Sequence, residues 1–125
     1  MRYDDDGGTN AGGAYILFLT TGGLVKSAQK ISNSYGALAS FYTLDDVDYF
    51  GGSSSSIGDL DGDSVNDLVV GANADDDGVT NAGAVYILFV TTNGLVKSAQ
   101  KISNSYGGLS AFCTIDWLDV FGTSS

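Results

Sequence analysis

The sequence predicts an all-β fold, and three observations support this prediction. The chain of 125 residues repeats itself with a period of 71 residues (95 − 24 = 71), since residues 24–36 return unchanged as residues 95–107. Its apolar runs are short and are separated by Gly, Asp, Asn and Ser, which favour turns. No segment has the apolar period of an amphipathic helix. We therefore expect short strands joined by turns.

Within one repeat, the pattern predicts four strands. Residues 50–57 form a strand of small residues, and residues 67–71 form the strand that follows an acidic loop. Residues 84–90 are the strongest strand, and their apolar residues fall on both faces, as in a strand covered on both sides. Residues 95–102 are more polar. They suit an exposed edge strand, because long polar side chains there block unwanted pairing: Lys97, Gln100 and Lys101.

Four short antiparallel strands in a period longer than the ~40 to 50 residues of common blade repeats indicate a β-propeller blade. We expect a partial blade in residues 1–49, a complete blade in residues 50–120 and the start of another in residues 121–125. A second acidic loop would begin beyond Ser125. The chain is thus expected to be a fragment of a larger propeller, or one completed by several copies. A parallel β-helix is the alternative architecture.

The acidic loop between the first two predicted strands carries the main candidate site. Four carboxylates at alternate positions repel one another unless a cation lies among them, and Ca²⁺ suits a flexible loop of oxygen ligands. We expect side-chain ligands from Asp59, Asp61, Asp63 and Asp67 and a backbone carbonyl ligand from Val65. The alternative is a solvated acidic turn, for which Asp, Gly, Asn and Ser are ordinary residues.

The ligand spacing follows an EF-hand loop over its first five positions only. Position 12 is Val70, where an EF-hand needs a bidentate Glu, and all fifteen acidic residues of this chain are Asp. The flanks also read as strands, whereas an EF-hand needs helices. The loop is therefore expected to be a calcium turn between two strands.

Composition excludes several classes of function. The net charge is −10 and only five residues are Lys or Arg, which argues against nucleic-acid binding. No apolar run reaches the ~18 residues of a membrane span. The chain has no His, so the serines at positions 53–56 cannot form a Ser-His-Asp triad within it.

Other conspicuous residues are expected to be structural. The triple-Asp turns at residues 4–6 and 75–77 are interpreted as solvated turns. Cys113 and Trp117 are expected to be buried. Four aromatic residues of the most apolar strands are expected to form the core between blades: Tyr15, Phe18, Tyr86 and Phe89.

Taken together, these motifs resemble the FG-GAP repeat. The resemblance rests on four ordered motifs: Phe50-Gly51-Gly52-Ser53, then Gly58-Asp59-Leu60-Asp61-Gly62-Asp63, then Asp67-Leu68-Val69-Val70-Gly71-Ala72, then Gly83-Ala84-Val85-Tyr86-Ile87-Leu88-Phe89. Such repeats form the seven-bladed propeller of integrin α chains and occur in bacterial surface and secreted proteins. The resemblance implies Ca²⁺ binding by the acidic loop. Position 6 of that loop is usually Gly and is Ser64 here, and the GAP motif reads Gly71-Ala72-Asn73.

The function implied is that of a calcium-stabilised module of an extracellular or cell-surface protein, which binds protein partners or mediates adhesion and is not an enzyme. The metal would have a structural role, and neither nucleic acid nor direct membrane insertion is expected. Two alternatives remain: an accessory propeller region of a secreted hydrolase, and a self-assembling module in which several copies complete a ring.

Overall fold

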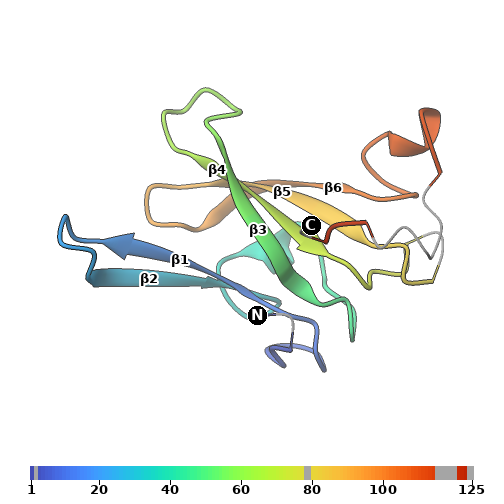
Figure 1. Cartoon of the computed structure of the whole chain (residues 1–125), viewed down its shortest axis with the longest axis horizontal. Helices are drawn as coiled ribbons and strands as arrows, with labels where there is room; N and C mark the ends of the chain where they lie inside the picture. Colours follow the sequence, from blue (N-terminus) through green and yellow to red (C-terminus); the bar gives the residue numbers. More distant parts are fainter. Residues whose placement is uncertain (2, 78–79, 115–120, 124–125) are drawn as a thin grey trace.

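The chain forms two antiparallel β-sheets in a computed structural model that describes residues 1, 3–77, 80–114 and 121–123 (Figure 1). A two-stranded sheet has the order β1-β2, and a four-stranded sheet has the order β3-β4-β5-β6. Two short 3₁₀ turns, η1 and η2, follow β2 and β6. The elements are β1 (Ala14–Leu19), β2 (Val25–Ile31), η1 (Leu38–Ser40), β3 (Phe50–Gly58), β4 (Asp67–Ala72), β5 (Ala84–Val90), β6 (Val96–Ile102) and η2 (Leu109–Ala111).

The four-stranded sheet confirms the prediction of an all-β chain built from blades of four antiparallel strands. Each strand pairs with the next in sequence, so that β3 and β6 form the two edges. The predicted strand at residues 84–90 has the bounds of β5, and the other three differ from prediction by one residue at one end. Within the described residues, no helix is long and apolar enough to cross a bilayer.

The β1-β2 sheet repeats the pairing of β5 and β6. Ala14 pairs with Ile31, and one period later Val85 pairs with Ile102; both hairpins shift register just before their turn. The sequence of β2 is identical to that of β6. The β1-β2 sheet therefore corresponds to the β5-β6 half of the four-stranded sheet, one repeat earlier.

A hydrophobic core joins the two repeats. Strand β5 alternates buried and half-buried side chains, so one of its faces is fully covered. The Tyr86 ring on that face meets the ring of Phe50 edge-on, with centroids 5.3 Å apart. Leu38 and Leu44, from the connection between β2 and β3, belong to the same buried cluster. The core thus forms where the connection of one repeat packs on the sheet of the next.

Two parallel bridges repeat at the same period. The Phe50 N–H donates to the Ala11 carbonyl at 3.0 Å, and the Phe121 N–H donates to the Ala82 carbonyl at 2.9 Å. Gly12 pairs with Phe50 in the first bridge, and a Cβ on this glycine would lie 2.1 Å from the Phe50 carbonyl oxygen. The close approach of the two backbones therefore requires glycine at position 12.

Several packing predictions are wrong. The sequence places Tyr15 in the core with Tyr86, but Tyr15 is half exposed, whereas Tyr86 is fully buried; Phe18 and Phe89 are partly buried. Cys113 is exposed, and within the described residues no further sheet covers η2. The prediction for Trp117 lies outside the described residues.

Candidate metal site

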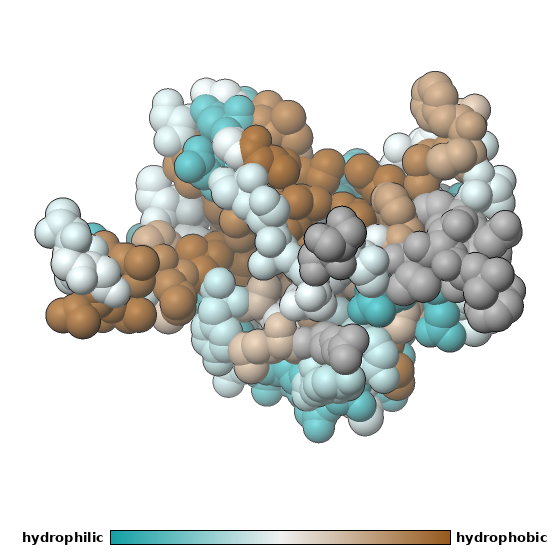
Figure 2. Space-filling model, viewed as in Figure 1, coloured by the Kyte–Doolittle hydropathy of each residue, from teal (hydrophilic) through white to brown (hydrophobic). Residues whose placement is uncertain are grey.

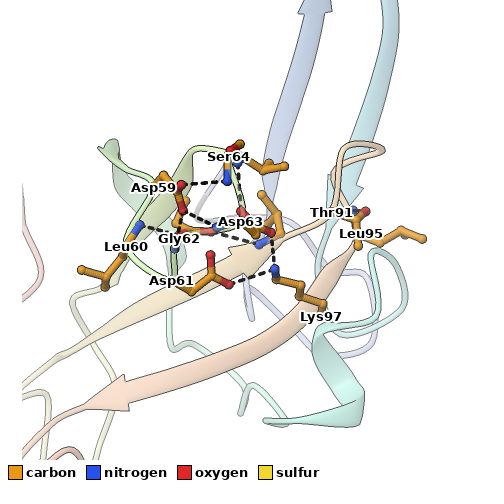
Figure 3. A network of polar contacts seen from close by, with 12 residues as sticks. Asp59, Leu60, Asp61, Gly62, Asp63, Ser64, Thr91, Leu95 and Lys97 are labelled. Atoms are coloured by element: carbon orange, nitrogen blue, oxygen red, sulfur yellow. Dashed lines mark hydrogen bonds and ion pairs between the residues drawn. The ribbon is translucent and has the colours of Figure 1, made fainter.

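The acidic loop joins β3 to β4, and Asp59 organises its turn (Figure 3). The Asp59 carboxylate accepts hydrogen bonds from three backbone N–H groups: Gly62 at 2.7 Å, Asp63 at 3.0 Å and Ser64 at 2.7 Å. These bonds close the loop around one side chain, as aspartate commonly does in turns. Asp59 is exposed, so it can also accept a cation.

Asp67 anchors the loop to the sheet. Its side chain is fully buried at the first residue of β4. One carboxylate oxygen accepts from the Leu60 N–H at 2.9 Å, and the other accepts from the Val90 N–H at 3.3 Å. A buried carboxylate needs such partners to offset its desolvation. Asp67 thus connects the loop with the end of β5.

Asp61 and Asp63 share one lysine, Lys97. The sequence pattern predicts that Lys97 lies on an edge strand but does not predict its contact with the acidic loop. The Lys97 ammonium lies 2.8 Å from the Asp61 carboxylate and also contacts Asp63. These two carboxylates raise the pKa of Lys97. The Lys97 ammonium and the Val65 N–H in turn lower the pKa of Asp63. Lys97 is thus an internal counter-ion of the loop.

Three of the five predicted ligands converge. Oxygen atoms of Asp59, Asp61 and Asp67 lie within 4.8 Å of one another. Asp63 is not part of this group; its carboxylate accepts from the Val65 N–H at 2.8 Å and contacts Lys97. Val65 is half buried and packs against the core.

The donor set fits a hard divalent cation. The three converging groups are carboxylates, the ligands that Ca²⁺ prefers, and the exposure of Asp59 and Asp61 leaves room for water ligands. Ser64 has the backbone φ of +69° that its position requires, a conformation that costs a non-glycine residue energy. The Ser64 N–H nevertheless donates to Asp59 in this conformation.

The triple-Asp turns are not simply solvated, contrary to the sequence prediction. Asp75 is buried, and its carboxylate lies 2.7 Å from the ammonium of Lys101, which also contacts Asp77. The Tyr86 O–H donates to Asp75 at 3.1 Å. The first and third Asp of the turn thus point to one lysine, and Lys101 is buried although it lies on an edge strand.

The same ion-pair arrangement occurs one repeat earlier. The Lys30 ammonium lies 2.6 Å from Asp4 and contacts Asp6.

Burial opposes the charge on Lys101, but its two carboxylate partners outweigh that cost and raise its pKa. Each of these turns directs its first and third Asp to one lysine, and neither turn is part of the group of converging carboxylates found among the described residues, so both are better explained as structural ion pairs than as metal sites.

The comparisons with known proteins add one match. A model of the FG-GAP repeat family matches residues 51–88, which run from the second residue of β3 to the middle of β5 and include the acidic loop. The comparisons with curated proteins and with solved structures gave no match.

Proposed function

Because residues 51–88 form an FG-GAP repeat, we propose that this chain is a calcium-binding propeller module of an extracellular or cell-surface protein. Its role is to bind protein partners or mediate adhesion, and it does not act as an enzyme. The match supports this role, because FG-GAP repeats build the propeller of integrin α chains. The chain's own charge of −10 is consistent with a protein partner and not with nucleic acid.

The convergence of Asp59, Asp61 and Asp67 is the observation that supports calcium binding most directly. Like charges held this close repel, so a bound cation would stabilise the loop. Asp67 also accepts from the Val90 N–H of β5. A cation on Asp67 would therefore link the loop to β4 and β5 together, which gives the metal a structural role.

Lys97 sets the expected strength of the site. Its ammonium contacts Asp61 and so competes with any cation for that oxygen. Competition of this kind favours an affinity in the weak extracellular class, with Kd of about 10⁻⁴ to 10⁻³ M. Such a site would fill in the Ca²⁺-rich exterior and empty on chelation.

Calorimetric titration of the EDTA-treated chain with Ca²⁺ tests the proposal, with thermal melts in parallel. We expect one saturable site and a higher Tm with Ca²⁺, because a ligand of the folded state stabilises it. Asp61→Asn is the preferred variant. Among the described contacts, the Asp61 side chain accepts no hydrogen bond from the loop backbone, whereas the side chains of Asp59 and Asp67 do and so support the turn.

Asp45→Asn is the matched control, because it removes the same charge from an exposed residue outside the loop. Binding should be lost in Asp61→Asn and retained in Asp45→Asn. The proposal is wrong if the wild-type chain shows no saturable heat at millimolar Ca²⁺, or if both variants bind as the wild type does.

A further inference from the structure

The β1-β2 hairpin exposes an apolar face that its counterpart in the next repeat keeps buried. Figure 2 shows apolar surface over this hairpin, at one end of the molecule. We call Tyr15, Leu17, Leu19 and Val25 the near face. Their side chains are 49%, 52%, 51% and 56% exposed, whereas their repeat equivalents are 0%, 0%, 4% and 3% exposed: Tyr86, Leu88, Val90 and Val96.

The equivalent face of β5 and β6 is covered by the connection of the preceding repeat. The Val96 N–H donates to the Gly36 carbonyl at 2.9 Å. The Lys101 N–H donates to the Tyr42 hydroxyl at 3.2 Å, and the Tyr42 ring meets the Tyr86 ring edge-on at 5.7 Å. Leucine side chains of the same connection fill the space between them, in one buried cluster with β5: Leu38 and Leu44.

The connection after β6 is the repeat equivalent of this covering connection. Among the described residues, it packs on no further sheet. Residues 107–114, the covering segment, correspond to residues 36–43. Leu109 is only half buried where its equivalent Leu38 is fully buried. Phe112 is 90% exposed, against 42% for its equivalent Phe41. This segment, which includes η2, lies at the opposite end of the molecule from β1 and β2 (Figures 1 and 2).

We propose that the near face of one copy of this chain binds the covering segment of a second copy, head to tail. The chain already makes this contact internally, between the connection after β2 and the β5-β6 hairpin, and it carries both kinds of surface a second time, in β1-β2 and in residues 107–114. The β1-β2 hairpin matches the β5-β6 hairpin closely, because β2 and β6 are identical in sequence and the two hairpins have the same pairing register.

One difference sets the strength of the contact. Tyr42, which contacts Tyr86 and Lys101 internally, is replaced by Cys113 in the covering segment. The contact between copies therefore lacks one ring and one hydroxyl and should be weaker than the internal one. The contact joins two different surfaces, so a bound pair leaves one near face and one covering segment free, and the assembly grows into a ring or a filament.

Sedimentation velocity of the whole chain tests the proposal, with EDTA present so that the result does not depend on the calcium proposal. The wild-type chain should sediment faster as its concentration rises. Leu17→Asp, on the near face, and Leu109→Asp, on the covering segment, should each raise the association Kd at least about tenfold, because a charge enters an apolar contact. An equimolar mixture of the two variants should form a 1:1 dimer that does not grow further.

The dimer in the mixture is the decisive result, since each variant keeps the surface that the other has lost. Leu95→Asp, an exposed leucine outside both surfaces, is the control and should associate as the wild type does. If circular dichroism shows that either test variant is unfolded, Val25→Asp and Phe112→Asp replace them. A wild-type chain that stays monomeric up to about 1 mM, or a variant mixture without dimers, would overturn the proposal.

Discussion

Asp48→Asn should stabilise the protein at neutral and alkaline pH. Asp48 lies just before β3 and is only 4% exposed. Burial raises its pKa from 3.8 to about 7; the Asp45 N–H, which donates to its carboxylate at 2.8 Å, opposes this rise, and nearby Asp75 adds to it. Lys101 also faces this carboxyl group and favours its charged form.

The sign of the effect follows from proton binding. Between about pH 4 and pH 7 the folded chain holds a proton on Asp48 that the unfolded chain has released, so the stabilising contribution is complete below about pH 4 and is lost as the pH rises through 7. A pKa rise of this size corresponds to about 4 kcal/mol at most. Asp48→Asn keeps an oxygen acceptor for the Asp45 N–H and cannot ionise. We expect it to gain roughly 2 to 4 kcal/mol over the wild type at about pH 8, and little at about pH 4.

Urea unfolding of both proteins across this pH range measures the difference. Asp46→Asn serves as the control, since it removes a charge from an exposed residue that is not among the groups shifting the pKa of Asp48 and keeps the oxygen that accepts from the Thr9 N–H; it should give a small difference that changes little with pH. A difference between Asp48→Asn and wild type that is constant from pH 4 to pH 8, or that favours the wild type at pH 8, would refute the reasoning.

Three further predictions concern the lysines and the loop. Lys97→Met should tighten Ca²⁺ binding several-fold in calorimetry by removing a competing cation, while its repeat equivalent, Lys26→Met, leaves the affinity unchanged; equal effects would contradict the role of Lys97. Lys101→Met should lower the free energy of unfolding by roughly 3 to 5 kcal/mol, because it leaves a buried carboxylate without its cation. The more exposed Lys30→Met should cost clearly less, and similar losses would count against burial as the cause. Ser64→Gly should add roughly 0.5 to 1 kcal/mol of stability by relieving a φ of +69°, and an unchanged urea midpoint would argue against that strain.

The strands could be predicted because their signals are local. The apolar pattern of residues 84–90 gives the bounds of β5, and turn-forming residues mark the ends of the other strands. The position of the acidic loop could be predicted in the same way, but its spacing gives only part of the converging set, since Asp59, Asp61 and Asp67 converge and Asp63 contacts Lys97 instead. In each case the information lies within one short segment of the chain.

The side-chain partners could not be predicted, because they come from distant segments. Lys97 reaches Asp63 across 34 residues, and the lysine beside Asp75 lies on β6, beyond the whole of β5. A pattern of three consecutive Asp gives no sign that a later strand will supply a lysine to the first of them. The repeat itself is a usable signal, since Lys30 and Lys101 stand at the same distance from the two triple-Asp turns. The exposure of Tyr15 depends on what covers its sheet, which the strand pattern does not encode.

The glycine bridges have a consequence for how such a chain can change in length. Each bridge joins a glycine just before the third strand of one repeat to the phenylalanine that opens the next, as Gly12 does with Phe50 and Gly83 with Phe121. The two pairs of partners have the same separation in the sequence, and it is shorter than one period. Duplication of any stretch one period long therefore adds one complete bridge and breaks none. A chain that gained or lost one whole period at any point would thus keep every bridge matched.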